Sequence, residues 1–374
     1  MIQSEIISQP EEIRKFEPQW RQMFHSGKYQ PSASFEWTWA LISTHIGKND
    51  SFQLVVMKDG DDVVGLIPLI RREIKRYGLS IVNLFPISEI YNTHSDLIIK
   101  NSSLVIERLL NILFSIKRWD VFRMGYFLEN SSQLAAFESC LNGSSFQYDI
   151  QDVEPAFFIE FKGGYSDYLM ERSGKFRNYL NRMDRKINQM GDVRFEKVKN
   201  ETSLKKVYDH LLHIEERSWK NDHGTSINRV KKQEKFYKLL CENTSENGWL
   251  HLVFLYLNNE PIAYNMGLVA NDIYYYLKTS YVNEYRKVSP STVLRARLIE
   301  DLIAQGVRFF DFPGEPYEWE KQWADSLRWH KGMILYNRSF KAKALSKYQR
   351  VKKARERNRK TSDVVYHDPR RLKL

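Results

Sequence analysis

The feature of this sequence that most constrains its fold is a long apolar hairpin pattern that occurs twice. The first copy reads FQLVVMKDGDDVVGLIPLI from Phe52, and the second reads WLHLVFLYLNNEPIAYNMGLV from Trp249. In each copy a turn dipeptide, Asp-Gly or Asn-Asn, separates two apolar runs, which is typical of paired antiparallel strands. The repeat indicates an internal duplication. Two unrelated hairpins would share the same features, so that alternative stays open.

The length of the chain favours two domains, because 374 residues exceed what one ordinary core holds. Hydrophobic residues make up 42% of the chain and aromatic residues 14%, which predicts packed globular structure rather than disorder. We place an N-terminal domain at residues 1–150, a C-terminal domain at 151–337 and a basic tail at 338–374.

The net charge of +11 belongs to the tail. Residues 338–374 hold 14 Lys/Arg and 3 Asp/Glu, whereas the rest of the chain holds 43 of each sign and is neutral. The body therefore has no bulk bias toward nucleic acid. The segment 341–360, KAKALSKYQRVKKARERNRK, is compatible with a helix that binds an anionic membrane surface or RNA, and a solubilising tail is the alternative.

Several classes of protein are disfavoured by what the sequence lacks. The first residues contain no apolar core of a signal peptide, and no run approaches 18 uncharged apolar residues. Cys140 and Cys241 both sit in helical patterns and are interpreted as buried thiols, and the nine His residues show no metal-ligand spacing. We expect a cytoplasmic protein without a metal.

Helical and strand periodicities predict an α/β fold in which each half has a mixed, mainly antiparallel sheet flanked by helices. In the first half, beside the hairpin, we expect helices at 10–23, 35–46, 104–116 and 132–141 and strands at 79–85, 96–99 and 120–124. In the second half we expect helices at 173–190, 204–219, 231–242 and 292–305 and strands at 155–161, 249–257, 261–270, 273–281 and 308–312.

The most informative stretch is the strand–loop–helix–strand pattern at 273–312. Arg286 and Lys287 lie in its loop, followed by Ser289-Pro290-Ser291 directly before the helix. A helix N-terminus offers unpaired N–H groups and a partial positive charge, so it suits a pyrophosphate, although Pro290 has no N–H to donate. An ordinary Ser-capped helix with a basic loop is the alternative interpretation.

This loop resembles the Gln/Arg-x-x-Gly-x-Gly/Ala loop of GNAT acetyltransferases. Arg286 takes the first place, and Ser289 and Ser291 stand where that family has glycines. The resemblance implies an acyl-CoA site, with the thioester oxygen polarised by backbone N–H groups of the strand before the loop. It assigns donor binding to Lys278, Thr279, Tyr281, Arg286, Lys287, Ser289, Ser291 and Thr292.

Four further segments resemble the CelD-type branch of that superfamily, which is linked to cellulose and exopolysaccharide biosynthesis. They are the helix carrying Phe176, Arg177, Leu180, Arg182, Arg185 and Lys186; the segment Glu215, Ser218, Trp219, Lys220 and Gly224; the loop with Tyr285 and Ser289-Pro290; and the closing segment Asp311, Gly314, Glu315, Tyr317 and Trp323. Glu318 departs from the branch, which usually has Lys there.

The branch implies two tandem GNAT-like domains, in a layout similar to that of Fem-type transferases. It implies transfer of an acetyl or other acyl group from CoA to an amine or hydroxyl. The acceptor would be a sugar, a polysaccharide precursor or another small molecule, and no metal is needed.

The chemistry requires a base for the acceptor and an acid for the leaving thiolate. Asp311 or Glu315, at the end of a strand, is our candidate base, and Tyr317 is our candidate acid. A turn-capping Asp, a solvated Glu and a core Tyr are the alternatives.

For the acceptor we name Arg177 and Arg182 as a basic wall with Arg185 and Lys186, and Trp219 with Lys220 as a pocket. The solvated face of an amphipathic helix and a core tryptophan are the alternatives.

Two other functions stay open. One is a Fem-type transferase that takes aminoacyl-tRNA, which the tail's charge favours and the neutral body disfavours. The other is a non-catalytic interaction protein on a GNAT scaffold, which the serines in the glycine places favour. Docking of a cytoplasmic enzyme to the inner membrane surface through the tail is a further hypothesis.

Overall fold

The chain packs into two compact units. The computed structural model describes residues 2–76, 78–91, 94–100, 102–198, 201–314, 316–324 and 326–357. Unit 1 consists of Met1–Pro155 together with Arg328–Leu374, and unit 2 consists of Ala156–Leu327. Residues 328–357 thus pack with the N-terminal half, whereas a linear division places 328–337 in the C-terminal domain.

Unit 1 contains a sheet with the strand order β1-β2-β3-β4-β6-β13, continued by the start of β7, while β5 pairs with β3. The strands are β1 (Ile2–Ile7), β2 (Ser51–Asp59), β3 (Asp62–Arg76), β4 (Leu79–Pro86), β5 (Ile98–Ile99), β6 (Val121–Leu128), β7 (Gln147–Glu160) and β13 (Ser326–Tyr336). The α-helices are α1 (Glu17–Ser26), α2 (Phe35–His45), α3 (Ser102–Ser115), α4 (Ser132–Leu141) and α11 (Phe340–Arg357), and the 3-10 helices are η1 (Pro10–Phe16), η2 (Pro31–Ala33) and η3 (Ile87–Tyr91).

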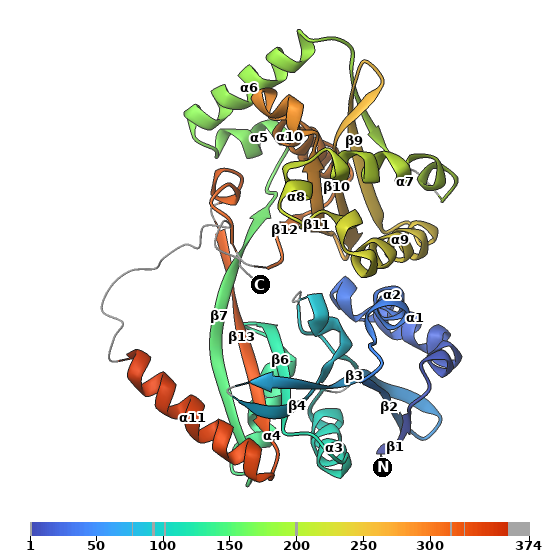
Figure 1. The fold of residues 1–374 in the computed structure, drawn as a ribbon, viewed down its shortest axis with the longest axis vertical. Helices are drawn as coiled ribbons and strands as arrows, with labels where there is room; N and C mark the ends of the chain where they lie inside the picture. Colours follow the sequence, from blue (N-terminus) through green and yellow to red (C-terminus); the bar gives the residue numbers. More distant parts are fainter. Residues whose placement is uncertain are drawn as a thin grey trace. The chain divides into compact units, whose positions relative to one another are not determined.

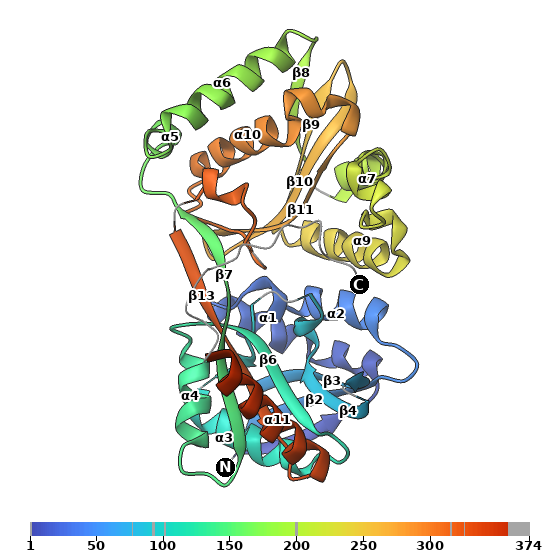
Figure 2. The same cartoon turned by 60° about the vertical axis from the view of Figure 1, so that its left-hand side comes forward.

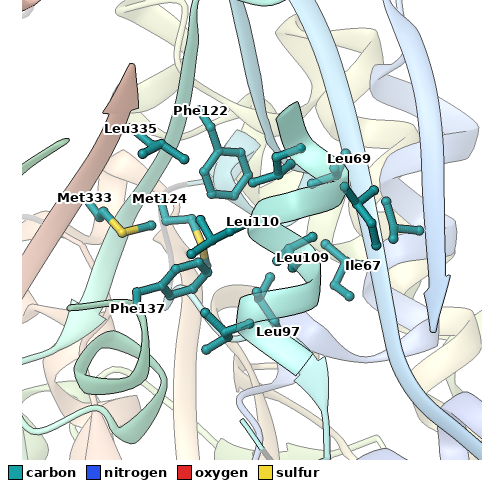
Figure 3. Close-up of a cluster of buried hydrophobic side chains, with 14 of the residues drawn as sticks. Ile67, Leu69, Leu97, Leu109, Leu110, Phe122, Met124, Phe137, Met333 and Leu335 are labelled. Carbon is teal, nitrogen blue, oxygen red and sulfur yellow. The ribbon is translucent and has the colours of Figure 1, made fainter. Parts of the chain in front are cut away.

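The core of unit 1 forms where the apolar faces of α3 and α4 meet the sheet. Leu109 and Leu110 from α3 pack with Phe122 and Met124 from β6 and with Leu335 from β13, as Figure 3 shows. These side chains alternate along β6 and β13, as expected for strands that bury one face.

The basic tail is partly built into unit 1. Ala342 and Leu345 of α11 are buried against Ile81, Ile334 and Tyr336, so the first turns of this helix belong to a packed cluster. Beyond Arg357 the predicted tail lies outside the described residues.

Unit 2 contains a sheet with the order β7-β12-β11-β10-β9-β8, entered by the last residues of β7. Its further strands are β8 (Val193–Lys197), β9 (Leu250–Leu257), β10 (Glu260–Ala270), β11 (Ile273–Tyr281) and β12 (Phe309–Asp311). Its α-helices are α5 (Tyr165–Met170), α6 (Gly174–Asn188), α7 (Glu201–Glu216), α8 (Trp219–Asp222), α9 (Lys231–Glu246) and α10 (Pro290–Ala304), and its 3-10 helices are η4 (Ile227–Arg229), η5 (Asn283–Val288) and η6 (Glu320–Gln322).

Helices cover both faces of the unit 2 sheet. Figure 2 shows α6 and α10 on one face of β9–β11 and α7 and α9 on the other. Leu294 and Leu298 of α10 pack with Val253 and Tyr274 in a core cluster on the face that α10 covers. All strand pairs in unit 2 are antiparallel except β11 with β12.

The predicted fold class is confirmed: each unit is a mixed, mainly antiparallel sheet flanked by helices, as the ribbon in Figure 1 shows. The sequence analysis did not predict β1, β8 and β13. Their registers are set by long-range pairing with β2, β9 and β6, and not by a local pattern of their own.

Candidate active site

The candidate site begins where β11 and β12 stop pairing. The two parallel strands share only three Cα pairs, from Ile273↔Phe309 to Tyr275↔Asp311, and β12 ends at Asp311. β11 continues to Tyr281 and stays paired with β10 on its other side. Among the described residues, the edge of β11 that faces β12 has no strand partner beyond Tyr275. Backbone groups at this edge can therefore bond to another molecule.

A bulge in β11 changes which side chains face each layer. Gly267 of β10 is aligned with Tyr276, but its neighbour Met266 is aligned with Lys278, so Leu277 is the extra residue. Tyr276 packs on the α10 side with Phe310, at 6.1 Å between ring centroids. Lys278 lies on the opposite side, with its ammonium 5.5 Å from the ring centroid of Tyr237 in α9. Without the bulge, the two side chains would share a face.

The loop after β11 runs through η5 into the N-terminus of α10. Its last residue, Ser289, has φ 48° and ψ 58°, in the left-handed region that favours glycine. This conformation explains why Ser289 stands at a glycine place of the GNAT loop pattern. The hydroxyl groups of Ser289 and Tyr179 in α6 are 2.6 Å apart, and this hydrogen bond holds the strained residue in place.

The start of α10 has the features of an anion site. The side chains of Arg286 and Lys287 are exposed and form no ion pair with the described residues. The Oγ atom of Ser291, in the first turn of α10, is buried and has no hydrogen-bond partner among the described residues. Pro290 has no N–H, and the N–H groups of Thr292 and Val293 donate to the Ser289 carbonyl at 2.9 and 3.2 Å. The two cations and the Ser291 hydroxyl are therefore the groups that fit a pyrophosphate at this helix start.

A pocket of about 440 Å³ adjoins this loop within unit 2. It is lined by Glu216, Arg217, Ser218, Asp222, Asn283, Glu284, Arg286 and Lys287. Arg217 forms ion pairs with Glu260 and, at 2.8 Å, with Glu284. Arg286 and Lys287 of η5 are therefore the cations of this pocket that can neutralise a bound anion.

On the α7 side of β11 lies a buried polar cluster around Glu215, which is 0% exposed. Its Oε1 atom accepts a hydrogen bond from the Tyr264 hydroxyl at 2.5 Å, and its Oε2 accepts one from the backbone N–H of Ile227 at 2.8 Å. The Lys220 ammonium lies 3.8 Å from Oε1 and donates to the backbone carbonyl of Thr279 in β11. Burial lowers the pKa of Lys220 to about 8, against the opposing attraction of Glu215.

A second buried polar group fills the α10 side beside the free edge of β11. Arg295 of α10 is 4% exposed, and its guanidinium lies 4.2 Å from the ring centroid of Trp319. Glu320 is 3% exposed and accepts a hydrogen bond from the backbone N–H of Tyr317 at 2.9 Å. Burial raises the pKa of Glu320 to about 8.

The candidate acid and bases lie in different surroundings. Asp311 is 0% exposed at the end of β12, where β11 and β12 part. Tyr317 is 39% exposed and stacks on Trp319 with 6.3 Å between ring centroids. Glu315 lies outside the described residues.

The residues proposed for the acceptor are not brought together. Arg177 donates to the backbone carbonyls of Arg172, at 2.6 Å, and of Met170, so it caps the end of α5. Arg182 is exposed beside the ring of Tyr179, at 5.6 Å. Trp219 is 40% exposed next to Lys220, which alone of the four reaches β11.

Sequence reasoning gave no role to Glu215, Arg295 and Glu320. Glu215 stood in the segment that resembles the CelD-type branch, and this was the available signal. For Arg295 and Glu320 no local pattern exists, because their importance comes from burial between segments distant in sequence. No group of acidic, His or Cys side chains that could hold a metal occurs among the described residues.

Comparison with known families identifies the domain that carries this site. Residues 174–321 match the family described as acetyltransferase (GNAT) domain. They form a GNAT domain. The matched residues include β11, η5, α10 and β12. Because the matched family is one of acetyltransferases, the chain is a transferase. No curated protein matches it in sequence.

Solved structures resemble the whole chain in fold. The crystal structure of FemX aligns with a TM-score of 0.58 at 11% identity, over 89% of this chain and 97% of FemX. A conserved protein of unknown function from Bacteroides thetaiotaomicron aligns at 0.54 and 12% identity, over 90% and 100%. A tandem GNAT protein from the clavulanic acid pathway aligns at 0.45 and 10% identity, over 90% and 100%. At these identities the likeness describes the fold alone.

Proposed function

We propose that the GNAT domain transfers an acyl group from acyl-CoA, with acetyl-CoA as the first donor to test, to an amine or hydroxyl of a small acceptor. The proposal rests on one observation: β11 extends beyond the end of β12 and continues through η5 into the start of α10. There, Arg286 and Lys287 form no ion pair and the Ser291 hydroxyl has no hydrogen-bond partner among the described residues. An extended thioester needs a strand edge, and its diphosphate needs such a helix start.

In this proposal the diphosphate lies at the first turn of α10. Arg286 and Lys287 supply charge, and Ser291 supplies a hydroxyl donor. The acyl carbonyl bonds to backbone N–H groups of β11 between Lys278 and Tyr281. Such fixed donors stabilise the oxyanion of the transition state because they need no reorganisation.

For proton transfer we propose that Asp311 or Glu315 accepts the proton of the acceptor and that Tyr317 protonates the leaving thiolate. Asp311 ends β12 at the point where the strands part, and Tyr317 follows a few residues later. The acceptor would come from the α7–α8 side, where Lys220 contacts β11. Membership of the CelD-type branch, with a saccharide acceptor, is the finer form of the same proposal.

Calorimetry with acetyl-CoA tests the donor site. The wild type is compared with the double variant Arg286→Ala, Ser291→Asp, in which a carboxylate at the helix start repels the diphosphate. Lys238→Ala, the loss of one exposed charge on α9, is the control.

Binding by the wild type and by Lys238→Ala, with loss in the double variant, is the expected result. A folded wild type that binds neither acetyl-CoA nor longer acyl-CoAs would contradict the proposal. Aminoacyl-tRNA would then be the next donor to test.

A further inference from the structure

The α7 face of β11 contains more positive than negative charge. Lys278 comes from β11 itself, Lys220 from α8 and Glu215 from α7. The side chain of Lys220 is 16% exposed, that of Glu215 is 0% exposed, and Lys278 is half-buried. Two ammonium groups therefore share a largely buried space with one carboxylate.

Glu215 cannot neutralise both lysines. Its two oxygens already accept hydrogen bonds from Tyr264 and from the backbone of Ile227. Lys220 approaches one of them at 3.8 Å and also donates to the Thr279 carbonyl. Lys278 has no ion pair with any described residue, and its ammonium lies 5.5 Å from the ring centroid of Tyr237. One positive charge thus remains uncompensated.

An uncompensated buried charge costs free energy, and proteins keep such groups where a ligand supplies the opposite charge. Burial lowers the pKa of Lys278 as well as that of Lys220, which is the direction expected for ammonium groups held without enough counter-charge. The bulge at Leu277 is what turns Lys278 to this face, so the backbone itself is arranged to present the charge here.

A further polar atom on the same face also has no partner. Ser280 follows Lys278 by two residues, so after the bulge both point to the α7 side. Its side chain is 1% exposed, and its Oγ has no hydrogen-bond partner among the described residues. A buried hydroxyl of this kind is an available donor for an oxyanion.

We propose that this face binds an anionic group, a carboxylate or a phosphate, on the acyl acceptor, between the ammonium groups of Lys220 and Lys278. The inference rests on the proposed function, because it places the acceptor on the face of β11 opposite α10 and the donor. A neutral acceptor would leave the excess charge uncompensated. An acceptor with an anionic group would be oriented at β11, with its amine or hydroxyl directed at the thioester.

The test uses simple anions as probes, without acyl-CoA. Thermal unfolding of the full chain is followed with acetate and with inorganic phosphate, each titrated at constant ionic strength with chloride as the reference salt. A ligand that binds the folded state raises the unfolding temperature in proportion to its affinity. Acetate alone would point to a carboxylate acceptor, and phosphate alone to a phosphorylated one.

The variants are Lys278→Met, which keeps the length of the side chain without its charge, Lys278→Arg and the control Lys238→Met on α9. We expect Lys278→Met to lose the anion-specific shift, with about a tenfold loss of apparent affinity. Lys278→Arg and Lys238→Met should retain it. Without added anion, Lys278→Met should unfold at the same or a higher temperature than the wild type.

An equal shift in the wild type and in Lys278→Met, or no shift in the wild type with either anion, would overturn the inference. Binding of acetyl-CoA to the same variants keeps this result separate from the donor proposal. Loss of anion binding with intact acetyl-CoA binding supports the inference. A wild type that binds the anion but no acyl-CoA would refute the proposed function while leaving the anion site standing.

Discussion

The two units share one order of elements but differ at the loop where a donor would bind. In each, an antiparallel hairpin is followed by a third strand, a 3-10 helix, an α-helix and a strand parallel to the third. The order is β11-η5-α10-β12 in unit 2 and β4-η3-β5-α3-β6 in unit 1, where the short strand β5 precedes the α-helix. The topology therefore supports the duplication that the two hairpins suggested. The difference lies between the 3-10 helix and the α-helix.

In unit 2 the 3-10 helix leads straight into α10 through Ser289, and the loop is basic. In unit 1, residues 92–101 separate η3 from α3, and two carboxylates, Glu89 of η3 and Asp96 of this segment, accept hydrogen bonds within the unit. Glu89 accepts a hydrogen bond from the Gly125 backbone at 2.7 Å, and Asp96 accepts one from Gln30 at 3.1 Å. The carboxylates of Glu89 and Asp96 do not suit a diphosphate, so we place the proposed donor site at the loop of unit 2 and not here.

Removing the Glu215 carboxylate from unit 2 and the Glu89 carboxylate from unit 1 gives the largest expected contrast. Glu215→Ala should lower the free energy of unfolding by roughly 3 to 5 kcal/mol, because it leaves Tyr264, the Ile227 N–H and Lys220 unpaired in a buried place. Glu89→Ala should cost less, about 1 to 3 kcal/mol, since it removes hydrogen bonds from Ser95 and from the Gly125 backbone and leaves no buried lysine without its carboxylate. Urea unfolding measures both, and equal losses would contradict the contrast.

The pH dependence of stability is the next effect in size. Burial raises the pKa of Glu320 to about 8 and that of Glu89 to about 7. The folded state then holds a proton that the unfolded state has lost, so stability falls as pH rises from about 4.5 through these values. For Glu320 the fall is on the order of 3 kcal/mol, allowing for residual solvent contact, because a pKa difference of one is worth about 1.4 kcal/mol.

Glu320→Gln should flatten the pH profile more than Glu89→Gln does, and over a range that extends to higher pH. Urea unfolding at a series of pH values checks this. A steeper profile in either variant, or a larger effect of Glu89→Gln, would refute the assignment.

A matched pair of helix starts probes the donor site. Ser291 and Ser103 are the second residues of α10 and α3. Ser291→Asp should weaken binding of acetyl-CoA about tenfold or more, because the new charge faces the diphosphate, whereas Ser103→Asp should leave it unchanged. The dissociation constants come from calorimetry. Equal weakening by both changes would remove the distinction between the units.

The smallest expected effect concerns Ser289, whose left-handed conformation has no counterpart among the described residues of the segment 87–100. Ser289→Ala loses the bond to Tyr179 and keeps the strain, so it should cost about 1 kcal/mol. Ser289→Gly loses the same bond but relieves the strain, so stability should change by less than about 0.5 kcal/mol. Thermal unfolding of the two variants checks the order, and a reversed order would contradict it.

Local patterns were enough to predict most helices and the hairpins. The strand Ile273–Tyr281 was predicted with its observed bounds, because apolar residues and turn signals define it. The position of the loop before α10 followed from the same signals. The left-handed conformation of Ser289 was not predicted, although the resemblance had placed this residue at a glycine position.

The rest of the site depends on tertiary structure. The bulge at Leu277 determines the face of Lys278, and nothing in the sequence announces it. Arg177 caps α5 because the end of α5 lies beside α6. The helical periodicity of residues 173–190 does not predict this position. Charge imbalance around Glu215 likewise arises only when three distant segments meet. No described helix is long and apolar enough to cross a membrane, while docking through the exposed face of α11 stays a prediction.

The central claim is that unit 2, and not unit 1, binds the acyl donor. Hydrogen–deuterium exchange of the full chain with and without acetyl-CoA tests this most directly. The account predicts slower exchange in β11, η5 and the first turn of α10, with no change in β4, η3 and α3. Protection of the unit 1 segment, or no protection of η5 and α10 at saturating acetyl-CoA, would contradict it.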